Sequence, residues 1–136
     1  MKAKYRKILC PIEFERISIS AIEIARNLAK KDDAAVYLLC VVPADRSKLK
    51  AELEHMAHDS LRGIAHKWLE RKVRYKILVR TGRPAAVIIE AAEETGADLI
   101  VMATHGRTGK NLVHLGSVTE QVVRQSTRPV LTIKPT

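Results

Sequence analysis

The sequence predicts a doubly wound α/β fold, with a five-stranded parallel sheet covered by helices on both faces. Strand and helix signals alternate along the chain, and every connection between consecutive strands contains a helix, which favours parallel pairing. Several strands are continuous apolar runs, as expected when both faces of a sheet are covered. The length of 136 residues predicts a single domain, residues 1–136.

The first three elements follow from apolar runs and helical spacing. Residues 7–12, KILCPI, form a short apolar run that predicts a strand. Residues 18–30 place apolar side chains at every third or fourth position, the spacing of an amphipathic helix. Residues 34–42, AAVYLLCVV, are uninterrupted apolar sequence and predict a buried strand.

A long helix is predicted next, over residues 46–71, which are rich in Lys, Glu and Ala. Met56 and Trp68 lie at helical spacing on this segment, and we expect both in the core. The strand predicted at 73–79 follows directly.

The third helix is predicted over residues 85–95, after a turn. Pro84 suits the first turn of a helix, and Gly96 suits a helix end. The remaining predicted elements are a strand at 97–103, a helix at 117–126 and a strand at 129–134.

The net charge of +9 suggests an anionic partner. Residues 71–83 carry six basic residues and no acid, and in a strand Arg74 and Lys76 would project from one face. Such side chains deter unwanted pairing of an edge strand, or they form a surface that steers a polyanion or nucleotide. Aromatic residues are only 4% of the chain, which argues against a nucleic-acid binder that stacks bases.

No targeting or membrane-spanning segment is predicted, because Glu13 interrupts the first apolar run after the basic start. Cys10 and Cys40 lie inside apolar strands, which favours two reduced thiols in the core. These features predict a cytoplasmic protein.

A glycine-rich stretch, ATHGRTGKNLVHLGS, occupies residues 103–117. It is not a P-loop of the form G-x-x-x-x-G-K-[ST], because Thr104 and Asn111 stand at two of the required positions. Gly106 follows a strand, and Gly116 with Ser117 opens a helix, where backbone N–H groups and the helix dipole favour an anion.

The same stretch has a purely structural alternative. Ser117 and Glu120 fit the S-x-x-E capping box, in which Ser117 would bond the N–H groups of its own helix. Gly106 and Gly109 would then be turn residues.

The chain resembles the universal stress protein family over essentially its whole length. Nucleotide-binding members of that family carry G-x2-G-x9-G-[ST] after the fourth strand. The matching stretch here begins with Ala103, Thr104, His105 and Gly106. Nine residues follow, and then Gly116 and Ser117. The first strand and helix, ILCPIEFERISISAIEIA, and the ending VTEQVVRQSTRPVLTIK are also similar to the family.

The resemblance implies the strand order 3-2-1-4-5 and a homodimer formed through the last strand, Val130–Lys134. For one branch of the family it also implies ATP, possibly with Mg²⁺, bound between the ends of the first and fourth strands. The main chain near Val41 would then recognise adenine, and Glu13 would meet the ribose. The implied nucleotide-binding residues are Pro11, Ile12, Glu13, Val41, Ala103, Gly106, Arg107, Gly109, Gly116, Ser117, Val118 and Thr119.

This sequence departs from the family pattern at Ala103, which replaces the first motif glycine, and at Glu13, which replaces an aspartate. No catalytic residue or metal ligand is assigned, because hydrolysis needs a base or water-orienting group beside the γ-phosphate and the sequence identifies none. Binding is therefore favoured over catalysis, with slow ATP hydrolysis left open. The leading hypothesis is an ATP-binding, homodimeric stress-response or signalling module, and the alternative is a nucleotide-free dimeric interaction module with an unknown protein partner.

Overall fold

The structure is a computed structural model, and it describes residues 4–13, 18–44, 49–104 and 116–134. The sheet has the order β3-β2-β1-β4-β5, and all of its strand pairs are parallel. This confirms the predicted doubly wound fold and its strand order. The elements are β1 (Lys7–Ile12), α1 (Ile19–Asp32), β2 (Ala35–Pro43), α2 (Lys50–Trp68), β3 (Arg74–Gly82), α3 (Pro84–Thr95), β4 (Leu99–Ala103), α4 (Ser117–Gln125) and β5 (Val130–Ile133).

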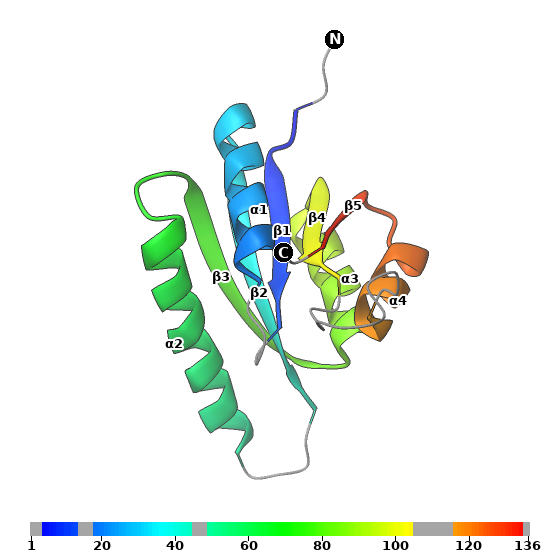
Figure 1. Cartoon of the computed structure of the whole chain (residues 1–136). Coiled ribbons are helices and arrows are strands. Elements are labelled where there is room, and N and C mark those ends of the chain that lie inside the picture. The colour runs from blue at the N-terminus through cyan, green and yellow to red at the C-terminus, as the bar shows by residue number, and fades with distance from the viewer. Residues whose placement is uncertain (1–3, 14–17, 45–48, 105–115, 135–136) are drawn as a thin grey trace.

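α1 and α2 pack on one face of the sheet, and α3 and α4 pack on the other (Figure 1). One core cluster joins α1 and α2 to strand residues such as Ile8 and Cys10, and the other joins α3 and α4 to residues such as Leu9. Successive strand residues thus point into opposite clusters. Cys10 and Cys40 are free and buried, as predicted, and burial raises the pKa of the Cys10 thiol to about 12, which keeps it protonated.

Local sequence signals explain where α1 begins and where α3 begins and ends. The Ser18 hydroxyl accepts a hydrogen bond from the backbone N–H of Ala21 (3.3 Å) and so caps α1. Pro84 begins α3, where its missing N–H has no cost, and Gly96 ends that helix in the left-handed region (φ 71°).

Two predictions about the segment 46–83 were wrong in detail. Met56 is not a core residue, since it is 56% exposed, whereas Trp68 packs against the core as expected. The buried stripe of α2 runs through Ala57 and Leu61 instead, and Met56 lies outside it. The strand predicted to end at residue 79 continues to Gly82, because β2 supplies a pairing partner as far as Pro43.

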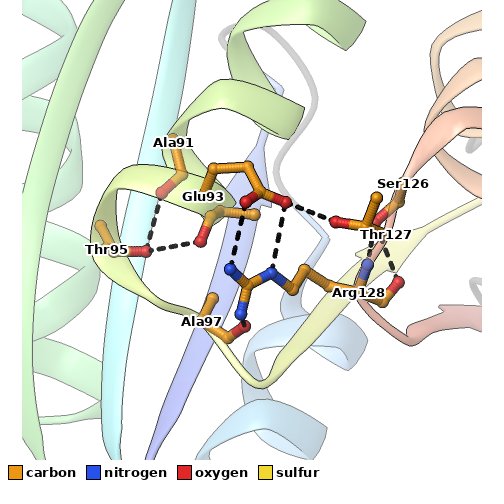
Figure 2. Close-up of polar contacts among 8 residues, drawn as sticks. Ala91, Glu93, Thr95, Ala97, Ser126, Thr127 and Arg128 are labelled. Atoms are coloured by element: carbon orange, nitrogen blue, oxygen red, sulfur yellow. Dashed lines mark hydrogen bonds and ion pairs between the residues drawn. The ribbon is translucent and has the colours of Figure 1, made fainter.

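A polar cluster ties the turn before β5 to the end of α3 (Figure 2). The Arg128 guanidinium lies between the Glu93 carboxylate, 3.3 Å away, and the carbonyl oxygen of Ala97, 3.0 Å away. The Thr127 hydroxyl also donates to Glu93. These hydrogen bonds, first that of Thr127 and then those of Arg128, lower the pKa of Glu93. The cluster lies where β4 and β5 begin, at the opposite end of these strands from Ala103 and Ile133.

The lowered pKa of Glu93 predicts a pH-dependent contribution to stability. A carboxyl whose pKa is lower in the folded state stabilises the fold above its unfolded pKa and loses that effect as the pH falls. We therefore expect Glu93→Gln to lower the melting temperature at neutral pH, and expect the difference from wild type to shrink at about pH 3. Glu90→Gln, the same change on an exposed position of α3, is the control. A deficit that persists at low pH would contradict this prediction.

Candidate nucleotide-binding site

The candidate site lies where the winding of the sheet reverses, between β1 and β4. These strands pair at Ile8 with Leu99 and at Leu9 with Ile100. Beyond the second pair, both strands continue by three residues, to Ile12 and Ala103. In open α/β sheets, ligands bind outside the carboxyl ends of the strands at such a reversal.

The first turn of α4 lies next to this edge. The N-cap residue is Gly116, and no side chain caps the helix. Its first intrahelical bond runs from the N–H of Glu120 to the carbonyl of Gly116 (2.9 Å), so the N–H groups of residues 117–119 precede it. Backbone donors in that position carry the positive end of the helix dipole and favour an anion.

This geometry contradicts the capping-box alternative for Ser117. Ser117 is already the first helical residue, one position too late to act as N-cap, and its side chain is exposed. The Glu120 carboxylate accepts a hydrogen bond from Arg124 (2.8 Å) instead of turning back to the helix start. Within the described residues, no side-chain cap occupies the N-terminus of α4, as an anion site requires.

Thr119 joins the start of α4 to the end of β4. Its hydroxyl donates a hydrogen bond to the carbonyl oxygen of Ala103 at 3.1 Å, and the residue is 4% exposed. Thr119 was predicted among the nucleotide-binding residues, but its hydroxyl is bonded within the protein. This hydrogen bond joins the start of α4 to the end of β4, the two described segments of the candidate motif. The sequence pattern alone could not indicate this contact.

The other predicted site residues in the described part of the chain differ in how exposed they are to solvent. Glu13 and Ser117 are exposed, Ile12 is buried, and half-buried positions are Pro11, Val41, Ala103, Gly116 and Val118. By strand alternation Pro11 shares its face with Leu9, and Val41 packs in the same cluster as Leu9, on the side covered by α3 and α4. Ile12 and Ala103 belong to the opposite cluster.

Gly106, Arg107 and Gly109 were also predicted as nucleotide-binding residues. They lie outside the described residues, as do His105 and His114. Of the glycine-rich stretch 103–117, the structure describes Ala103, Thr104, Gly116 and Ser117.

The spacing of His55 and His58, three positions apart on α2, raises the question of a metal site. Both are exposed, and His55 lies 3.3 Å from Asp59 one turn later, which is typical of a solvated helix face. Among the described residues no group of three or more His, Cys, Asp or Glu side chains could hold a metal ion. None of the helices in the described ranges is long and apolar enough to cross a membrane.

The fold and the site together define a class: a doubly wound α/β protein with an uncapped helix start at the reversal point of its sheet. The model of the Universal stress protein family matches residues 4–134, and the chain belongs to this family. It is similar to universal stress protein MJ0531 of Methanocaldococcus jannaschii, with 37% identity over 140 residues that cover 96% of this chain and 82% of the relative.

Solved structures show the same fold. The structure of protein MJ0577, a universal stress protein of the same organism, superposes with a TM-score of 0.85 at 29% identity, and the match covers 98% of this chain and 99% of that one. A universal stress protein in complex with cAMP has a TM-score of 0.69 at 20% identity, covering 98% of this chain and all of the other. At that identity the second match shows the fold alone.

Proposed function

We propose that this protein binds an adenine nucleotide, ATP in the first place, and acts as a homodimeric stress-response or signalling module. The observation that carries the proposal is the uncapped start of α4, held against the carboxyl end of β4 by the bond from Thr119 to Ala103. It supports phosphate binding because the N–H groups of residues 117–119, which precede the first bond within the helix, lie near the reversal point of the sheet.

The remaining strand ends offer suitable partners for the rest of the nucleotide. The Glu13 carboxylate is exposed directly after β1 and would accept a hydrogen bond from a ribose hydroxyl. The half-buried end of β2 around Val41 would receive the adenine ring through its main chain. Mg²⁺ would accompany the phosphates, because this ion is usually held by substrate phosphates and water.

The proposed dimer forms at the edge of the sheet where β5 lies. β5 is an edge strand of four residues without charge, and Leu131 on it is 37% exposed. An uncharged edge strand with an exposed apolar side chain is suited to pairing with a second copy. The two buried free cysteines support a cytoplasmic location, because such thiols persist in reducing compartments.

Calorimetric titration of the purified protein with Mg-ATP tests the proposal. We expect saturable binding of one nucleotide per chain, and a stabilisation of about 2.7 kcal/mol at a nucleotide concentration one hundred times Kd. Sedimentation equilibrium of the same sample is expected to give twice the monomer mass.

Gly116→Val is the matched variant, because it adds a branched side chain where a phosphate would approach the backbone. It is expected to abolish the calorimetric signal while the dimer mass is unchanged. If wild-type protein shows no saturable binding of ATP, ADP, AMP or cAMP, the nucleotide proposal is wrong. A dimer without nucleotide binding would then identify the alternative, a nucleotide-free interaction module.

A further inference from the structure

β3 is a long edge strand with an open outer side. It pairs with β2 through nine positions, from Arg74 to Gly82, and no other strand in the described ranges pairs with it. Figure 1 shows it at the margin of the sheet beside α2. An edge strand presents unpaired backbone groups to a partner. The carbonyl of Val79 accepts a bond from the neighbouring Arg80 guanidinium (3.3 Å), which shows that it lies within reach of groups outside the sheet.

One face of this edge is basic. Arg74, Lys76 and Arg80 lie on this face and are all exposed, and the half-buried Leu78 lies between the last two. Arg74 donates a hydrogen bond to the backbone carbonyl of Asp33 (2.6 Å) and lies 3.6 Å from the exposed Asp33 carboxylate. Arg80 lies 3.9 Å from the exposed carboxylate of Glu94, and exposed ion pairs of this kind contribute little to stability. The Lys76 ammonium lies 5.9 Å from the ring centroid of Tyr37 on β2. The positive charge of this face is thus available to a partner.

The intervening residues of β3 form an apolar row. Tyr75, Ile77 and Val79 are half-buried and pack against the core cluster that includes α2. Because strand neighbours point to opposite faces, a strand added beside β3 would meet basic side chains on one face and apolar ones on the other. A complementary strand therefore alternates acidic and apolar residues.

We propose that the β3 edge binds an extended acidic segment of a partner protein by strand addition, with acidic residues facing Arg74, Lys76 and Arg80. Main-chain hydrogen bonds would supply affinity, and the alternating side chains would supply specificity. A second copy of β3 is rejected, because like charges would lie opposite one another. The basic side chains thus exclude uncharged strands and the edge of another copy, while they select an acidic partner.

The probe is a fluorescent peptide in which glutamate and valine alternate. It has nine residues, the length of β3. The control peptide has the same composition with its glutamates and valines in separate blocks. We expect the alternating peptide to bind at least about tenfold more tightly than the control in anisotropy titrations, with new hydrogen-exchange protection on the amides of β3. A short duplex DNA is the third probe and tests bulk attraction to phosphates.

Matched protein variants locate the binding surface. Lys76→Gln combined with Arg80→Gln is expected to weaken binding of the alternating peptide by about tenfold. Lys30→Gln combined with Lys31→Gln removes the same charge at the exposed end of α1, on the other face of the sheet, and is expected to change affinity little. The proposal is overturned if neither peptide binds, if both bind equally, or if duplex DNA protects the β3 amides more strongly. None of these outcomes depends on the nucleotide site.

Discussion

Replacing Gly82 by alanine is expected to lower the free energy of unfolding by about 2–4 kcal/mol. Gly82 ends β3 with φ at +152°, a backbone conformation that L side chains rarely adopt. A Cβ atom at this position would also lie 2.8 Å from Cγ2 of Val87 in the first turn of α3. The valine side chain is branched at Cβ and has few alternative rotamers, so it cannot easily move away. Urea denaturation of the two proteins measures the difference.

Gly63→Ala is the matched control, with an effect of opposite sign. Gly63 is exposed within α2, and an added Cβ meets nothing within 4 Å. Alanine there is expected to raise the free energy of unfolding by about 0.5–1 kcal/mol, because it restricts the unfolded chain and favours the helix. Equal effects at the two positions would show that the close contact with Val87 does not govern the junction between β3 and α3.

Thr119→Val is expected to damage both stability and the proposed nucleotide binding. The change removes the hydroxyl that donates to the Ala103 carbonyl and leaves that oxygen without its partner, at a cost of about 1–3 kcal/mol. It also frees the start of α4 from the end of β4, two segments proposed to contact the same nucleotide. A displacement of about 1 Å between binding groups weakens their contacts with a ligand. We therefore expect Mg-ATP affinity to fall by about tenfold.

Thr119→Ser separates the two roles of this residue. Serine keeps the hydroxyl and loses only a buried methyl group, so we expect lower stability with nearly wild-type affinity. Calorimetric titration gives the affinity, and urea denaturation gives the stability of each variant. If Thr119→Val binds Mg-ATP as tightly as wild type does, the bond to Ala103 stabilises the fold and has no positioning role.

Much of the fold could be predicted from local signals. The predicted first strand, residues 7–12, matches β1, because its apolar run ends where the polar residue Glu13 begins. Pro84 and Gly96 mark the two ends of α3, since each residue has a backbone preference that acts locally. The strand order agreed with the family resemblance, which carried information that periodicity alone does not contain.

Other features depended on contacts between distant segments. The S-x-x-E pattern indicated a capping box at Ser117, but the helix begins one residue earlier than that pattern requires, with Gly116 as its cap. Met56 has an apolar side chain at a plausible spacing, but the rotation of α2 against the sheet leaves it exposed. Neither the exact helix register nor its rotation can be predicted from a short pattern, because packing against other elements sets both.

The sequence by itself determined the alternation of strands and helices, the aliphatic core, the excess of positive charge and the glycine motif with its departures at Glu13 and Ala103. These properties depend on residue type and on neighbours close in the chain. Only the tertiary structure decided that the Thr119 hydroxyl is bonded to Ala103, that α4 starts without a side-chain cap, and that the basic strand β3 lies at an open edge. Those outcomes depend on which distant segments the folded sheet brings together, and sequence spacing does not contain that information.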